Sequence, residues 1–279
     1  MENPQVPQPA HRPFPTVGDC FAMLGIVLGS MIVVALLLQI VAGFAGFDPG
    51  TADPQALGRY TCLLYVAPMS LALTGVLLYR RRRGGTGAIV GFSTARLSPV
   101  LLLWSCVLLV AVGIVIEPLL DLLPDFQLPV GKGVWTLLMA VLFAPFFEEF
   151  LCRGVVLGSL RARYGVIAAW LGSSLFFGIL HLVPALVVNA CIMGLILGYV
   201  YLATGSIWAS IILHAANNAI AYAMMTATGE QRMLIDWIGS RTLYGILYAA
   251  ALIVAGLSVW KMAGALRRMK AAEKNGADA

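Results

Sequence analysis

The chain has 279 residues, of which 60% are hydrophobic and only 11% are charged, and its mean hydropathy is +0.90. Soluble globular proteins carry roughly 25% charged residues, so this composition excludes an ordinary soluble domain. The formal charge of +5 does not indicate a nucleic-acid partner, because the basic residues are scattered and form no basic domain. The lipid bilayer is the expected environment of the protein.

Residues 1–19 are predicted to form a tail in water, because they contain five prolines and almost no apolar periodicity. The apolar run behind this tail is too long for the hydrophobic region of a secretory signal peptide and lacks a clear small-residue cleavage site. We therefore expect this first run to remain in the membrane.

Apolar runs of about 20 residues, each long enough to cross a hydrocarbon core of roughly 30 Å as a helix, follow one another along the chain. They predict an all-α bundle of eight transmembrane helices within residues 20–263, followed by a cytoplasmic tail at 264–279. The expected spans are 21–46, 60–79, 99–120, 134–157, 166–183, 185–203, 206–226 and 242–262. Only Pro184 separates the fifth span from the sixth, so a seven-span chain with one broken passage is the alternative.

The lysines and arginines predict the orientation, because positive residues are retained on the cytoplasmic side of a membrane. With the N-terminus inside, thirteen of the 18 basic residues fall on the cytoplasmic side, four fall outside, and Arg153 lies in the membrane. This distribution predicts a multi-pass protein of the cytoplasmic membrane with both termini in the cytoplasm.

Two residue types are expected to serve packing alone. The five cysteines lack CxxC spacing and a shared loop, which indicates unpaired apolar side chains. Gly25 with Gly29, and Gly194 with Gly198, have the small-xxx-small spacing that allows helices to approach closely.

The fourth span contains three ionisable residues, Glu148, Glu149 and Arg153. At roughly 2.5 to 3.5 kcal/mol per charged residue, the trio would cost about 7 to 10 kcal/mol if it faced lipid. Glu149 and Arg153 are four residues apart and share a helix face, so an ion pair is expected there. Glu148 is turned about 100° away from Glu149, which leaves it without that partner.

Two interpretations fit this trio. A buried ion network can fix helix register without doing chemistry, and this explains Glu149 and Arg153. It does not explain Glu148, whose carboxylate is a candidate general base. Pro145, one turn earlier, removes a backbone hydrogen bond and is expected to open the helix near the site.

Two of the three histidines in the sequence fall in predicted spans. His214 and Asn218 are four residues apart, which places both side chains on one helix face. His181 follows Phe177 by four residues near the end of the fifth span. Taken alone, His181 is more typical of a satisfied polar residue near a membrane surface than of a catalyst. Asn217 points away from His214 and is expected to make a packing hydrogen bond.

Three segments, Glu148-Glu149-xxx-Arg153, Phe177-xxx-His181 and His214-xxx-Asn218, resemble in this order the three motifs of the CPBP intramembrane protease family. That family includes CAAX prenyl endopeptidases of the Ras-converting type and bacterial proteins linked to bacteriocin processing and immunity. The resemblance covers a core at about 134–225 and matches every motif position. It implies hydrolysis of a peptide bond in a membrane-anchored or lipidated peptide.

The resemblance also implies roles for the site residues. Glu148, with His181, would activate the attacking water, and His214 and Asn218 would donate hydrogen bonds to the oxyanion. Glu149 and Arg153 would hold the site in shape. These roles agree with general chemistry, because a carboxylate beside a histidine can activate water and neutral donors on one helix face suit an oxyanion hole.

Zinc is the alternative to metal-free water activation. Glu148, His181 and His214 are ligand types that would hold Zn²⁺ with a water in the fourth position. The sequence has no HExxH pair, and His214 with Asn218 suits hydrogen bonding, so the metal-free site is favoured. Cys152 is a weak candidate nucleophile, since no histidine shares its helix and its neighbours are largely apolar.

Two non-enzymatic functions remain open at this point. A membrane immunity or scaffold protein of the same fold would bind its partner without turnover. A proton-coupled transporter would use the intramembrane carboxylates and histidines as a relay, although the sequence lacks the internal inverted repeat of many carriers.

Overall fold

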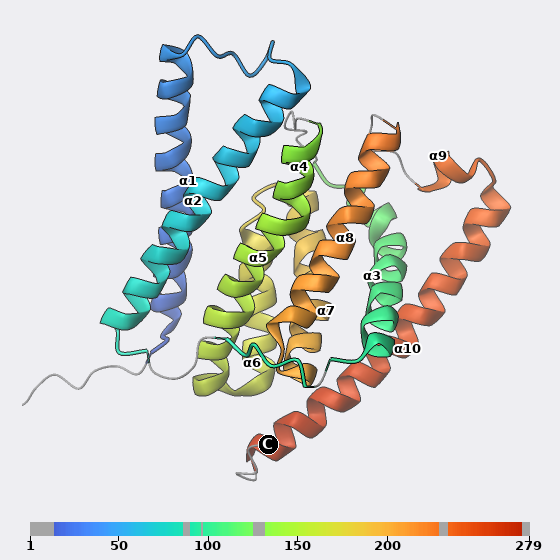
Figure 1. Cartoon of the computed structure of the whole chain (residues 1–279). Coiled ribbons are helices and arrows are strands. Elements are labelled where there is room, and N and C mark those ends of the chain that lie inside the picture. The colour runs from blue at the N-terminus through green and yellow to red at the C-terminus, as the bar shows by residue number, and fades with distance from the viewer. Residues whose placement is uncertain (1–13, 86–89, 96, 125–131, 229–233, 275–279) are drawn as a thin grey trace, which may run out of the picture.

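The computed structural model describes residues 14–85, 90–95, 97–124, 132–228 and 234–274, and within these residues the fold is helical (Figure 1). One isolated antiparallel bridge, between Phe92 and Ser206, is the β-type pairing in this part of the chain. The helical segments are α1 (Val17–Phe44), α2 (Pro54–Arg82), α3 (Pro99–Leu120), α4 (Val134–Leu138), η1 (Met139–Phe143), α5 (Ala144–Glu149), η2 (Phe150–Leu157), α6 (Gly158–Ile179), α7 (Pro184–Thr204), α8 (Ile207–Thr228), α9 (Leu234–Ile238) and α10 (Arg241–Lys274).

Six helices in the described ranges are long and apolar enough to span a membrane, and the protein is a multi-pass membrane protein. The 46-residue helix Val134–Ile179 joins the predicted fourth and fifth spans, but Gly165, with φ 78° and ψ 175°, breaks it between them. Helix α8 is not among the six and contains His214, Asn217 and Asn218. The count of eight and the cytoplasmic orientation stay predictions.

The first helix begins earlier than predicted. Thr16 caps α1 in a capping box with Asp19, so residues 17–19 belong to the helix and not to the predicted tail, of which residues 1–13 lie outside the described ranges. The buried Asp19 carboxylate also accepts hydrogen bonds from Tyr79 (2.6 Å) and Arg83 (2.8 Å). From the sequence alone, an acidic residue before an apolar run is typical of a loop. The partners that bury Asp19 lie about 60 positions away and cannot be recognised from local sequence.

The last helix ends later than predicted. Helix α10 continues to Lys274, whereas a tail was expected from residue 264. Leu266 is buried and Met269 packs against the same core cluster, so apolar contacts hold this segment helical beyond the last span. The first turn of α1 and the last turn of α10 lie at the same end of the bundle (Figure 1).

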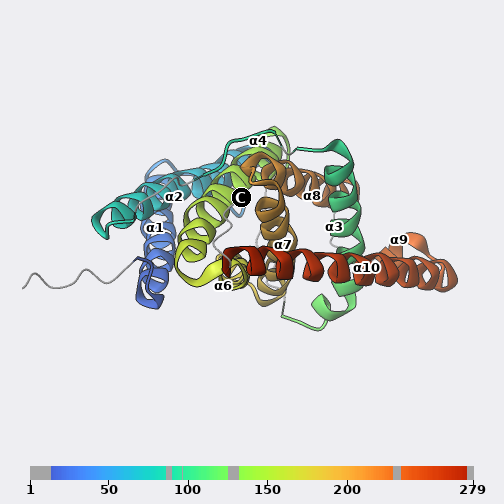
Figure 2. The same ribbon diagram turned by 90° about the horizontal axis from the view of Figure 1, so that it is seen from below.

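Two apolar clusters form the core. One joins α1, α2, η2 and α6 and includes fully buried Met23, Leu151 and Val155, and the other joins α3, α7, α8 and α10 and includes Leu109 and Leu213. Figure 2 shows α10 crossing the lower end of the bundle past α7. The segment from α4 to α8 therefore lies between the α1–α2 pair and the α3–α10 pair (Figure 1).

Helices α6 and α7 approach closely at glycines. A Cβ atom at Gly194 would lie 3.1 Å from Ser174 Cα, and one at Gly198 would lie 3.2 Å from Trp170 Cδ1, so the predicted packing role of this pair is confirmed. The same prediction is wrong for Gly25 and Gly29, where an added Cβ meets nothing within 4 Å. Spacing alone does not reveal which helix face has a neighbour.

Gly178→Ala is expected to destabilise the protein by about 1 to 3 kcal/mol, the usual cost of overpacking. The new methyl group would clash with Cys191 Sγ and lie 2.9 Å from the carbonyl of Val187. Thermal unfolding of the purified protein in detergent measures the effect. Gly29→Ala is the matched control and should change stability by no more than about 0.5 kcal/mol; equal losses in both variants would contradict the packing argument.

Candidate active site

Two π-helical segments, η1 and η2, flank the short helix α5 that carries Glu148 and Glu149. In η1 the Ala144 N–H bonds to the carbonyl of Met139, five residues back. The same register would pair the carbonyl of Ala140 with residue 145, which is a proline and has no N–H. Asn218 Nδ2 instead donates to the Ala140 carbonyl at 2.9 Å. Pro145 thus creates the acceptor that positions Asn218, and π-segments are frequent at functional sites.

The Arg153 guanidinium is fully buried and has three kinds of contact. Nη1 donates to Glu149 Oε1 at 2.8 Å and Nη2 donates to the Gly194 carbonyl at 3.0 Å. The guanidinium carbon also lies 4.6 Å from the centre of the Phe177 ring, within cation–π range. The expected ion pair with Glu149 is therefore present, with both side chains at 0% exposure.

Glu148 has two oxygens in different environments. Oε1 accepts a hydrogen bond from the Tyr65 hydroxyl at 2.6 Å. Oε2 is buried without a hydrogen-bond partner among the described residues and lies 3.8 Å from His214 Nε2. The carboxylate expected to be free is thus half satisfied, and its unsatisfied oxygen faces a histidine.

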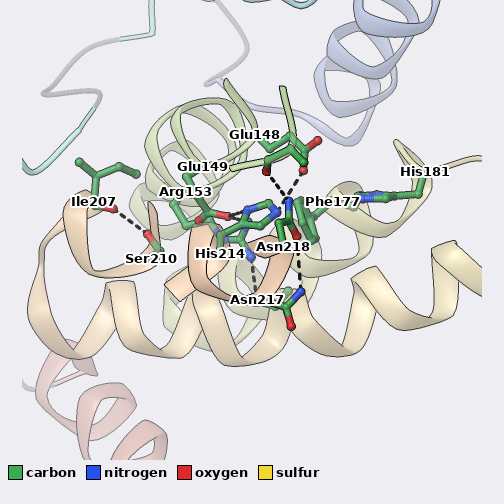
Figure 3. A network of polar contacts seen from close by, with 12 residues as sticks. Glu148, Glu149, Arg153, Phe177, His181, Ile207, Ser210, His214, Asn217 and Asn218 are labelled. Atoms are coloured by element: carbon green, nitrogen blue, oxygen red, sulfur yellow. Dashed lines mark hydrogen bonds and ion pairs between the residues drawn. The ribbon is translucent and has the colours of Figure 1, made fainter. Parts of the chain in front are cut away.

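His214 lies between the two glutamates (Figure 3). Its Nδ1 is 2.9 Å from Glu149 Oε1, the same oxygen that Arg153 contacts, and its Nε2 faces Glu148. Helix α8 presents His214 to α5 because Leu213 and Ala209 on the same helix are buried in the core. The structure therefore brings Glu148, Glu149, Arg153 and His214 into one network.

His181 stands apart from this network. Helix α6 ends at Ile179, so His181 lies in the turn before α7 and not in the fifth span expected to reach residue 183. Its Nδ1 is 3.0 Å from the carbonyl of Phe177. The Phe177 ring lies 5.0 Å from the His181 ring and 5.5 Å from the His214 ring, centre to centre, and Figure 3 shows His181 beyond Phe177, on the far side from His214.

A small cavity connects the two histidines. It has a volume of about 60 Å³, several times the roughly 15 Å³ that one water requires. Its polar lining consists of His181, Asn189, His214, Asn217 and Asn218. His181 therefore reaches the same cavity as His214 and Asn218, although it does not reach Glu148.

The three side chains considered as zinc ligands do not form a common donor set. No group of three His, Cys, Asp or Glu side chains within the described ranges is arranged to hold a metal ion. Phe177 separates His181 from His214, and Glu149 occupies His214 Nδ1. Cys152 is fully buried in the core cluster and does not line the cavity.

Residues 130–220 match the family described as type II CAAX prenyl endopeptidase Rce1-like. This segment is similar to an Rce1-like domain. The predicted resemblance is confirmed, and the matched segment contains Glu148, Glu149, Arg153, His181, His214 and Asn218. No curated protein and no solved structure matches the chain.

The structure adds two residues that the sequence did not single out. Tyr65 reaches Glu148 from α2, outside the segment that matches the family, and nothing distinguishes it in sequence from the other tyrosines of that helix. Asn189 lines the cavity from α7, and here a signal existed, because an amide within an apolar span is costly unless it faces protein or water. The site therefore includes residues from outside the three motifs.

Tyr65→Phe is expected to destabilise the protein by about 1 to 3 kcal/mol, because it leaves Glu148 Oε1 buried without its donor. Tyr60→Phe is the control, since the Tyr60 ring packs on Phe47 and its hydroxyl makes no hydrogen bond in the described part of the chain. Thermal unfolding in detergent compares them. Combining Tyr65→Phe with Glu148→Gln should give less than the sum of the two losses; strict additivity would contradict the contact.

Proposed function

We propose that this protein is an intramembrane endopeptidase that hydrolyses a peptide bond in a membrane-anchored or lipidated peptide. The observation that carries the proposal is the buried, unpaired Oε2 of Glu148, beside His214 and next to a cavity lined by carboxamides. The family match supports it, since the matched family is one of CAAX prenyl endopeptidases.

Glu148 acts as the general base. Its Oε2 accepts a proton from a water, and the oxygen of that water attacks the carbonyl carbon of the substrate. Tyr65 holds Oε1, which leaves Oε2 as the oxygen available to the water. Glu149 and Arg153 maintain the arrangement, because removing either partner of a buried ion pair costs about 3 to 5 kcal/mol.

Asn218 and His214 stabilise the oxyanion that forms during attack. The Asn218 amide nitrogen has two N–H groups, and the bond to the Ala140 carbonyl uses one of them. The second is available to the oxyanion in the cavity, and a single such donor contributes about 2.7 to 4 kcal/mol. The bond to Ala140 therefore fixes the amide in advance of the reaction.

His181 acts together with Glu148 from within the cavity, which His214 also lines and beyond which Glu148 contacts His214. Because Phe177 lies between His181 and His214, His181 contacts a bound water or the substrate and not Glu148 itself. The two residues therefore activate the water from two sides, and no resident metal is part of this proposal.

Glu148→Gln is expected to lower the rate of cleavage on the order of 10³-fold, within the range that general-base catalysis supplies, and His181→Ala and His214→Ala should also lower it strongly. Full-length protein in liposomes is assayed by mass spectrometry with lipidated and unlipidated forms of a membrane-anchored peptide library. Glu117→Gln is the matched control, since Glu117 bonds Leu234 and Tyr244 far along the chain from the site. If wild-type protein cleaves nothing, or if folded Glu148→Gln cleaves as well, the proposal is wrong.

Treatment of the liposomes with EDTA and with 1,10-phenanthroline is expected to leave the cleavage rate unchanged within twofold, because the proposed chemistry uses carboxylate, imidazole and amide groups alone. Restoration of a lost activity by added Zn²⁺, and by no other divalent cation, would contradict the metal-free mechanism. Thermal unfolding under the same treatment controls for general damage to the protein.

A further inference from the structure

The contacts of His214 determine which of its ring nitrogens carries the proton. Arg153 does not lose its proton in proteins, and its Nη1 lies 2.8 Å from Glu149 Oε1 with both side chains fully buried. Glu149 is therefore a carboxylate, which accepts hydrogen bonds and donates none. His214 Nδ1 lies 2.9 Å from the same oxygen, so the hydrogen of this bond belongs to Nδ1.

A neutral imidazole with hydrogen on Nδ1 has a lone pair on Nε2. That lone pair is on the side of Glu148, whose unpaired Oε2 is 3.8 Å from Nε2. In this state Nε2 has no hydrogen to offer an oxyanion. The oxyanion role of His214 therefore requires a proton that His214 does not carry at the start.

We infer that Glu149 is a positioning residue that fixes the tautomer of His214, and that His214 Nε2 receives the proton which Glu148 removes from the attacking water. The inference deepens the proposed endopeptidase function and rests on it. The protein thus has a relay from Glu148 to His214, with Glu149 behind the imidazole and Arg153 compensating the charge of Glu149.

One proton moves from the attacking water to the departing nitrogen, by way of Glu148 and His214. Glu148 Oε2 takes a proton from water while the water oxygen bonds to the carbonyl carbon, and the carbonyl π electrons move to oxygen. Glu148 then passes the proton to His214 Nε2, which becomes a donor to the oxyanion. When the carbonyl reforms and the C–N bond breaks, His214 gives the proton to the departing nitrogen. An acid and an amine leave, and both side chains return to their starting states.

The geometry favours the transfer from Glu148 to His214, because the unpaired Glu148 Oε2 lies 3.8 Å from His214 Nε2 and has no other partner among the described residues. The positive imidazolium then lies beside the Glu149 carboxylate, as in catalytic triads, where a carboxylate orients the histidine and stabilises its charged form. Both glutamates contribute, because one supplies the proton and the other holds the ring that receives it.

The tautomer is measured directly by ¹⁵N NMR of histidine-labelled, full-length protein in detergent micelles or nanodiscs. The chain has only three histidines, so the His181→Gln and His214→Gln variants assign the signals. The expected result is a protonated Nδ1 and an unprotonated Nε2 for His214 in the resting protein. A proton on Nε2, alone or together with one on Nδ1, would overturn the inference whatever the protein cleaves.

A second variant tests the role of Glu149. Glu149→Gln combined with Arg153→Met removes the carboxylate without leaving a buried charge unpaired. It is expected to mix the His214 tautomers and to lower kcat on the order of 10⁴-fold with little change in KM, as the wrong histidine tautomer does in a catalytic triad. Glu148→Gln is the companion variant, which should lose cleavage and keep the wild-type tautomer.

The outcomes separate the two proposals. Cleavage by wild-type protein together with an unchanged tautomer and unchanged kcat in the Glu149 double variant would overturn the positioning role of Glu149. A wild-type protein with the expected tautomer that cleaves no peptide would overturn the endopeptidase proposal and leave the tautomer assignment standing. If the double variant does not fold, the wild-type spectrum alone decides the assignment.

Discussion

One buried cation determines the arrangement of the site. A guanidinium with no exposure inside an apolar bundle requires a carboxylate and further acceptors, because an isolated buried charge is very costly. Arg153 obtains these from Glu149, from the Gly194 carbonyl and from the face of Phe177. Its contacts therefore join η2 to α5, α6 and α7. The close approach of α6 and α7 at their glycines brings the Gly194 carbonyl within reach, so the packing of that hairpin and the position of the cation depend on each other.

The Glu149 carboxylate in turn contacts both Arg153 and His214. Because its Oε1 is shared between Arg153 and His214, the carboxylate that neutralises the cation also orients the imidazole. Glu148, the next residue, points to a different set of partners, Tyr65 and His214 Nε2. Two adjacent glutamates thus have different roles for a geometrical reason, since successive residues of a helix are turned by about 100°. A buried ion pair and a carboxylate with an unpaired oxygen are therefore compatible within one short helix.

The backbone contributes as much as the side chains. Pro145 interrupts regular hydrogen bonding, the preceding residues form a π-helix, and the unsatisfied carbonyl of Ala140 becomes the anchor for Asn218. The sequence predicts a disturbed helix at Pro145. It does not predict that Asn218 binds the freed carbonyl of Ala140, because the two residues are 78 positions apart. The same limit applies to Tyr65 and Asn189, which only tertiary packing brings to the site. It applies also to His181, which the turn after α6 directs to the far side of Phe177.

The sequence by itself determined the membrane environment, the helical class, the ion pair of Glu149 with Arg153 and the family resemblance, because each depends on composition or on spacing within one helix or motif. It did not determine which glycine pairs meet a neighbour, since spacing does not say which face of a helix is covered. It also did not determine which side chains share a cavity or the proton positions on His214. The shared cavity and the tautomer of His214 depend on distances between helices that are remote in the chain. Only the tertiary structure shows that Glu148, Arg153 and His214 form a network around Glu149, whereas His181 lies outside it.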